Sequence, residues 1–185
     1  MPQSIINNGE HKMEKAIEAL EKEFALIRTS RANPTVLNGV LVPYYGAPTP
    51  LNQIAQISVP EPQILMIKPF DKSVLKEVEK AIQLADLNLV PQNDGVVIRI
   101  VFPALTEAKR KDLVKEVKAK TEHGKVAVRN VRREVMDHLK KLEKDSVISE
   151  DELKRHNDEV QKITDKYTDK MDALAKDKEK AIMEI

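Results

Sequence analysis

Residues 106–144 read TEAKRKDLVKEVKAKTEHGKVAVRNVRREVMDHLKKLEK, and this stretch decides the fold. It contains no proline, and its apolar side chains recur at helical spacing from Leu113 to Leu142. We therefore expect one continuous helix of about 60 Å. Gly124 is its weak position, because a glycine inside a helix costs about 1 kcal/mol relative to alanine.

Two further helices are predicted on either side of this stretch. On the C-terminal side, Ser149 and Glu152 have the spacing of a capping box. The helix that they begin should bury a seven-residue repeat, namely Leu153, Val160, Tyr167, Leu174 and Ala181. The N-terminal helix carries one apolar stripe, formed by Met13, Ile17, Leu20, Phe24 and Ile27. Because each helix must cover its apolar face, we expect a three-helix antiparallel bundle.

The middle of the chain has a different composition. Nine of the ten prolines lie between Pro34 and Pro103, and proline is unfavourable inside helices. Segments rich in Val and Ile predict strands at 36–45, 54–59, 64–67 and 96–101. Helical spacing of apolar residues predicts one helix at 73–85. This region should therefore form a small β/α/β domain.

The predicted fold class is α+β, with the small domain of residues 31–104 inserted into a bundle made by residues 1–30 and 105–185. The chain crosses between the domains near 30–34 and 102–106, and these crossings should act as hinges that make few contacts with either core. Small interfaces between domains permit relative motion. The predicted hinge residues are Ser30, Arg31, Ala32, Asn33, Pro103, Ala104, Leu105 and Thr106.

The overall composition excludes several classes of protein. The 185 residues include 31 Lys and Arg, 30 Asp and Glu, and no cysteine. Without cysteine there is no disulfide, no thiol catalysis and no thiolate metal site. No apolar run approaches the roughly 20 residues of a membrane span, and the N-terminus has no signal pattern. We expect a cytoplasmic protein that makes no membrane contact.

Positive charge is concentrated in one segment, because residues 109–133 hold ten basic and three acidic side chains. Steps of four and three place one row on a single helix face, and this basic stripe consists of Lys111, Lys115, Lys118, Glu122, Lys125, Arg129 and Arg132. A charged helix face is most often only solvated, yet acidic partners at i,i+4 are mostly missing here. A phosphate backbone would match such a row. Arg132 follows the core position Val131, so we expect it to be exposed.

The remaining motifs give little support for other chemistry. The four histidines lack metal-ligand spacing, and no nucleotide-binding or hydrolase motif occurs. Tyr44 and Tyr45 have rings that suit stacking on bases, but their place beside Pro43 and Gly46 favours a core position for at least one. We predict no catalytic residue, no cofactor and no metal.

Five segments carry a more specific signal. They are IRTSRANP at 27–34, YYGAPTPL at 44–51, PFD at 69–71, LTE at 105–107 and VAVRNVRRE at 126–134. In this order, over essentially the whole chain, they resemble the bacterial ribosome recycling factor family. Ser30 departs from the glycine expected in that family, which bears on the flexibility of the hinge.

The resemblance implies an L-shaped monomer with a tRNA-like outline. It implies binding to the post-termination ribosome, where such a factor acts with elongation factor G. GTP hydrolysis by that partner splits the ribosome and releases it from mRNA. The bundle would contact large-subunit ribosomal RNA, and the candidate RNA-binding residues are Arg132, Arg129, Arg133, Lys125, Lys118, Arg110, Arg28 and Arg31.

Two other functions stay open at the level of sequence. The chain would be a helical protein–protein adaptor if the basic face were incidental. It would be an enzyme if carboxylates of the small domain formed a catalytic pocket, although no motif supports this. Salt-dependent co-sedimentation with ribosomes separates the recycling factor from the adaptor.

Overall fold

A computed structural model describes residues 1–184, and the chain divides into two compact units. The first unit contains Met1–Ile27 and Ala108–Met183. The second contains Arg28–Glu107, together with Glu184. The α+β class is confirmed, because the first unit is helical and the second is built on β-sheet.

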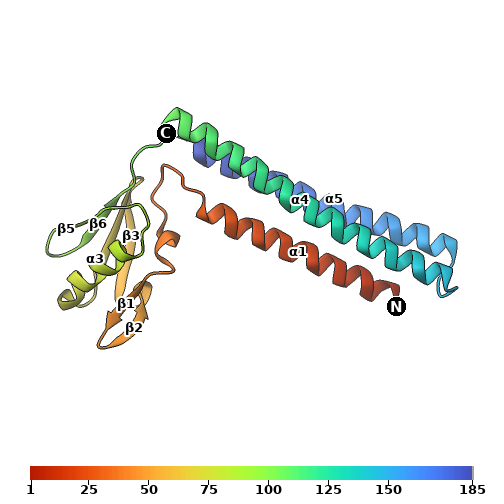
Figure 1. The fold of residues 1–185 in the computed structure, drawn as a ribbon, viewed down its shortest axis with the longest axis horizontal. Helices are drawn as coiled ribbons and strands as arrows, with labels where there is room; N and C mark the ends of the chain where they lie inside the picture. The colour runs from red at the N-terminus through yellow and green to blue at the C-terminus, as the bar shows by residue number, and fades with distance from the viewer. Residues whose placement is uncertain (185) are drawn as a thin grey trace. The chain divides into compact units, whose positions relative to one another are not determined.

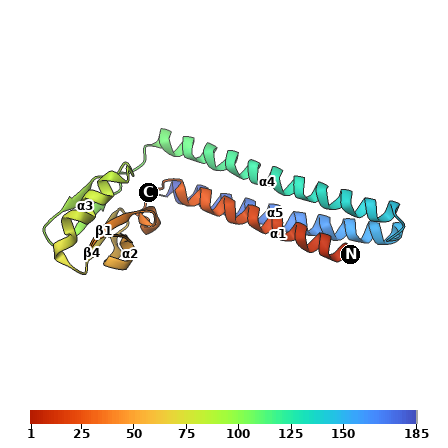
Figure 2. The same cartoon turned by 60° about the horizontal axis from the view of Figure 1, so that its bottom comes forward.

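The first unit is a bundle of helices α1 (Pro2–Leu26), α4 (Glu107–Lys144) and α5 (Glu150–Met183), which run alongside one another (Figure 1). Helix α4 continues without a break through Gly124, as predicted from its spacing. Figure 2 shows the same three helices from a second direction. The predicted long helices are therefore confirmed.

Ion pairs and hydrogen bonds between the helices define their directions. Lys12 of α1 lies 2.6 Å from Glu134, and Glu23 lies 3.6 Å from Lys120, so α1 and α4 are antiparallel. Helix α5 is also antiparallel to α4. With three helices one pair must then be parallel, and this pair is α1 and α5. Glu10 of α1 accordingly lies 3.3 Å from Lys166 of α5.

Apolar side chains of all three helices meet inside the bundle. One cluster combines Ile6 of α1, Val135 and Leu139 of α4, and Val160 of α5. Gly9 faces this cluster, and a Cβ atom placed there would collide with the side chain of Val135. The predicted α1 stripe is buried throughout, consisting of Met13, Ile17, Leu20, Phe24 and Ile27.

The turn between α4 and α5 contains the predicted capping box. The backbone N–H of Ser149 donates to Glu152 Oε2 at 2.8 Å. The backbone N–H of Glu152 donates to Ser149 Oγ at 3.2 Å. Both donors belong to a helix end that has no partners within the helix, so this exchange stabilises the start of α5.

The second unit contains two antiparallel sheets and short helices. Its four-stranded sheet has the order β3-β4-β6-β5, and β1 pairs with β2 in a separate two-stranded ribbon. The strands are β1 (Leu41–Tyr44), β2 (Ala47–Pro50), β3 (Ala55–Glu61), β4 (Ile64–Pro69), β5 (Pro91–Asn93) and β6 (Ile98–Val101). The helices are η1 (Pro34–Leu37), α2 (Leu51–Ile54), η2 (Lys72–Val74) and α3 (Leu75–Leu84).

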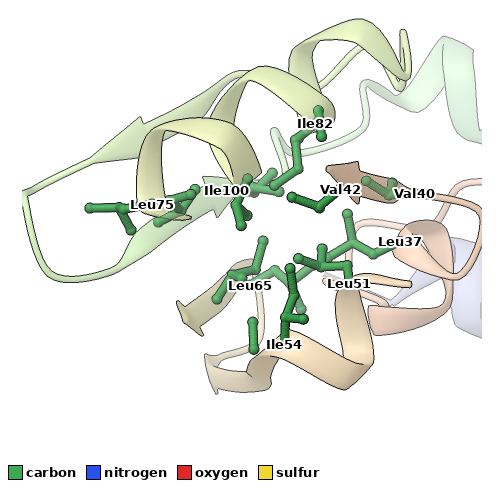
Figure 3. Packing of buried hydrophobic residues seen from close by; sticks show 14 of the residues in the cluster. Leu37, Val40, Val42, Leu51, Ile54, Leu65, Leu75, Ile82 and Ile100 are labelled. Atoms are coloured by element: carbon green, nitrogen blue, oxygen red, sulfur yellow. The ribbon is translucent and has the colours of Figure 1, made fainter. Parts of the chain in front are cut away.

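These elements enclose one apolar core between the sheet, the ribbon and α3 (Figure 3). Val42 comes from the ribbon, Leu65 and Ile100 from the sheet, and Ile82 from α3. All four side chains are buried. The core thus closes within the second unit.

The prediction for this unit missed β2, β5 and α2. Strand β2 reads APTP, and its two prolines argue against a strand because proline cannot donate to a sheet. In a two-stranded ribbon the missing donors face away from the partner strand, so the prolines are tolerated. The first predicted strand was too long, since Pro34–Leu37 forms a 3₁₀ turn capped by the Asn33 side chain.

The predicted hinge residues are more engaged than expected. The backbone N–H of Ala32 donates to Pro62 O at 2.7 Å, and its side chain packs against the second unit's core. Ser30 is 3% exposed, and Leu105 is also buried. The expectation of few core contacts is wrong at Ala32, which packs against the core, and burial of Ser30 and Leu105 shows that these positions are also enclosed.

Candidate nucleic-acid interface

The basic stripe lies along helix α4, whose unbroken helical backbone places residues three and four apart on one face. Lys115, Lys118, Arg129 and Arg133 are exposed on α4. Basic side chains held on a rigid helix can meet a line of phosphates without ordering the backbone first. This arrangement fits contact with nucleic acid.

Carboxylates of all three helices neutralise part of the positive charge of α4. Lys125 forms an ion pair with Asp172 of α5. Lys120 lies 3.6 Å from Glu23 of α1, and Arg129 lies 2.9 Å from Glu122 on α4 itself. Spacing within α4 could not reveal the first two pairs, because their acidic partners belong to other helices.

Arg132 is half-buried, so the expectation that it is exposed is wrong. Its Nη1 donates to Gln161 Oε1 of α5 at 2.7 Å, and Gln161 in turn donates to Asp165 at 2.9 Å. The Nε of Arg132 is buried without a hydrogen-bond partner among residues 1–184. The step from Val131 turns Arg132 away from the apolar core but toward α5. This contact orients the guanidinium, and the sequence did not reveal Gln161 as the partner of Arg132.

Three other arginines were predicted to bind RNA, and they do not belong to the group of Arg129, Arg132 and Arg133. They are Arg110, Arg28 and Arg31. Arg110 lies about 33 Å from Arg132 along α4, and its Nε is buried without a partner among the described residues. Arg28 and Arg31 belong to the second unit. Arg31 is exposed and lies 2.8 Å from Glu184, whereas Nε and Nη2 of Arg28 are buried without partners in residues 1–184.

The two tyrosines occupy different environments. Tyr44 packs against the core of the second unit, while Tyr45 is 82% exposed. Tyr45 has φ of 47°, which is uncommon for a bulky residue, and its hydroxyl donates to Asp71 Oδ2 at 3.2 Å. This hydrogen bond to a carboxylate raises the pKa of Tyr45 above its ordinary value. The ring of Tyr44 therefore packs against the core, as expected from the sequence for at least one of the two tyrosines.

Residues 1–184 show neither a metal-binding cluster nor a membrane-spanning helix. No group of three or more His, Cys, Asp or Glu side chains within residues 1–184 has metal-binding geometry. No helix in that range is both long and apolar enough to span a membrane.

Comparison with known proteins agrees with these features. The family model described as ribosome recycling factor matches residues 20–183. The ribosome-recycling factors of Geobacillus sp. (strain WCH70) and Bacillus subtilis (strain 168) are 56% and 54% identical to this chain, with both chains covered completely.

Solved structures are similar over the whole chain. A solution structure of ribosome recycling factor has a TM-score of 0.82 and 41% identity, covering 100% of this chain and 98% of that one. A second structure has a TM-score of 0.68 and 46% identity, with both chains covered completely. It describes the T. thermophilus factor and E. coli elongation factor G bound to the E. coli post-termination complex. The chain belongs to the ribosome recycling factor family.

Proposed function

We propose that this protein binds the post-termination ribosome through large-subunit ribosomal RNA, and that the basic face of α4 makes this contact. Arg132 carries the proposal, because a hydrogen bond of 2.7 Å to Gln161 orients its guanidinium. A pre-oriented arginine can donate to phosphate with little loss of side-chain freedom. Arg129 and Arg133 would extend the contact along the same helix.

The second unit would move relative to the first during recycling. Elongation factor G would supply the free energy by hydrolysing GTP, and this chain would contribute no bond chemistry. The hinge segments 30–34 and 102–106 would allow the movement, and different contacts with two ribosomal states would give it direction. On this reading the protein works in the cytoplasm as a monomer.

A polysome breakdown assay with elongation factor G and GTP tests this function. The wild-type protein should convert polysomes to free ribosomes or subunits, and a non-hydrolysable GTP analogue should prevent this. Arg132→Ala should reduce both ribosome binding and recycling. Arg155→Ala, which removes an exposed arginine from α5, should retain both. Full activity of Arg132→Ala would exclude the proposed role of Arg132, and stable binding to a protein partner instead of ribosomes would favour the adaptor.

A further inference from the structure

Helices α4 and α5 border a groove of about 560 Å³ on the first unit. Val114 and Met183 contribute apolar surface to it. Lysines from both helices surround this surface, and we name the site the lysine groove after them: Lys111, Lys115 and Lys118 from α4, and Lys176 and Lys180 from α5. Glu179 also lines the groove. An adjoining section of about 340 Å³ shares Lys118, Lys176 and Glu179, so the groove continues along the two helices.

Four lysines of the lysine groove have no carboxylate partner among the described residues. Within residues 1–184, no ion pair involves Lys115, Lys118, Lys176 or Lys180. Farther along α4 the situation is reversed, because Lys120, Lys125 and Arg129 all have carboxylate partners. The lysines of the groove without an ion pair among residues 1–184 are therefore Lys115 and Lys118 of α4, together with Lys176 and Lys180 of α5.

The sequence alone does not mark Lys176 and Lys180 as part of a basic site, because the charges of residues 149–180 sum to a negative value. Lys176 and Lys180 are four residues apart, which places them on one face of α5. That face meets the lysines of α4 only because α4 and α5 pack side by side. The site therefore depends on the fold as well as on the sequence.

We propose that the lysine groove is the principal electrostatic anchor for the RNA backbone, an inference that rests on the proposed function. Two rows of ammonium groups on antiparallel helices form a linear track, which matches an extended polyanion. Lysine meets phosphate as a compact charge without reading bases. The apolar surface of Val114 and Met183 would lie against the sugars. Arg132 would then orient the complex, while the lysine groove supplies most of its dependence on salt.

Co-sedimentation with 70S ribosomes over a salt series tests this assignment. The double variant Lys176→Ala/Lys180→Ala should bind more weakly at every salt concentration. Its slope of log K against log salt should be less steep by about 1.4 to 1.8, because two fewer counterions are released. Both side chains are exposed, and circular dichroism would verify folding. Lys176→Gln/Lys180→Gln would replace the variant if alanine disturbed the helix.

Lys15→Ala/Lys22→Ala is the matched control. It removes the same charge from exposed positions on α1, and no residue of α1 lines either section of the groove. Its slope should equal that of the wild type. If the wild type binds and the α5 variant retains the wild-type slope, the inference is overturned while the proposed function stands. A wild-type protein that does not sediment with ribosomes would overturn both.

A photo-crosslinking experiment distinguishes ribosomal RNA from ribosomal protein as the molecule that binds in the lysine groove. Because the chain has no cysteine, Glu179→Cys provides a single attachment point for a photo-crosslinker inside the groove. Crosslinks to ribosomal RNA are expected. Crosslinks confined to ribosomal protein would overturn the assignment and would identify an acidic protein surface as the occupant.

Discussion

At the scale of single residues, Arg132 combines a structural contact with the role in RNA binding that we propose for it. Its hydrogen bond to Gln161 links α4 to α5, while its Nε has no partner among residues 1–184. A hydrogen bond of this kind contributes a net stabilisation of about 0.5–1.5 kcal/mol. Substitutions at Arg132 will therefore change stability as well as binding, and the two effects need separate measurements.

We expect Arg132→Ala and Gln161→Ala each to lower the free energy of unfolding by about 0.5–1.5 kcal/mol. In a double-mutant cycle the losses should not add, because both variants remove the same hydrogen bond. Urea unfolding followed by circular dichroism measures this. Arg133→Ala is the control, since Arg133 is exposed, and its effect should stay within about 0.5 kcal/mol. Additive losses would show that the hydrogen bond contributes nothing.

At the scale of helices, two glycines in the bundle should respond in opposite ways to alanine. Alanine gains about 1 kcal/mol of helix propensity at either position. At Gly9 the new Cβ would collide with Val135, a buried branched side chain of α4. At Gly124 it would meet the flexible end of Met171, with the sulfur 3.1 Å away.

Gly9→Ala should therefore lower the midpoint of thermal unfolding, because overpacking a bundle costs about 1–3 kcal/mol. Gly124→Ala should leave it unchanged or raise it, since the methionine can move aside. Adding Val135→Ala to Gly9→Ala should remove the collision, so the double variant should lose less than the sum of the single losses. A Gly9→Ala protein as stable as the wild type would contradict close packing at this crossing.

The capping box at the start of α5 predicts a dependence of stability on pH. The N–H of Ser149 holds the pKa of Glu152 below its ordinary value. A carboxylate with a lowered pKa in the folded state stabilises the protein above its unfolded pKa, and the effect is lost as pH falls through the folded pKa. Glu152→Gln should therefore be less stable than the wild type at pH 7, and the difference should vanish in acid. Thermal unfolding of both proteins at several pH values measures this difference in stability. A difference that does not change with pH would contradict the prediction.

Ser149→Ala removes the other half of the same box. Loss of a serine N-cap typically costs about 1 kcal/mol. The variant should show this loss at neutral pH in chemical unfolding. Ser146→Ala is not a suitable control, because Ser146 has φ of 56° and alanine would be strained there. Ser58→Ala, in a strand of the second unit, is the better comparison.

At the scale of the whole molecule, two compact units joined by two chain crossings predict hinge motion. Dyes on Asp145→Cys in the first unit and Lys76→Cys in the second should give a broad distance distribution in single-molecule energy transfer. Both positions are exposed, and no native cysteine competes for the label. A control pair within the first unit, Lys15→Cys and Asp145→Cys, should give a narrow distribution. An equally narrow distribution for the first pair would contradict the hinge.

The sequence by itself determined the parts of the fold that depend on local periodicity. Helices α1, α4 and α5 and the capping box follow from apolar spacing and from a few end residues, because helical hydrogen bonds join residues close in sequence. The row of basic residues on α4 follows from the same periodicity. The motifs around Arg31 and Arg132 were enough to suggest the family.

Only the tertiary structure decided which charges remain free and which strands form. Strands β2 and β5 are short, and a strand depends on its neighbours for its hydrogen bonds, so APTP at 47–50 gave no usable signal. Asp172 neutralises Lys125, and Gln161 holds Arg132, from positions at least 29 residues away in sequence. Lys176 and Lys180 join the basic face of α4 only through packing. Electrostatic compensation depends on distances in space, which the order of residues does not contain.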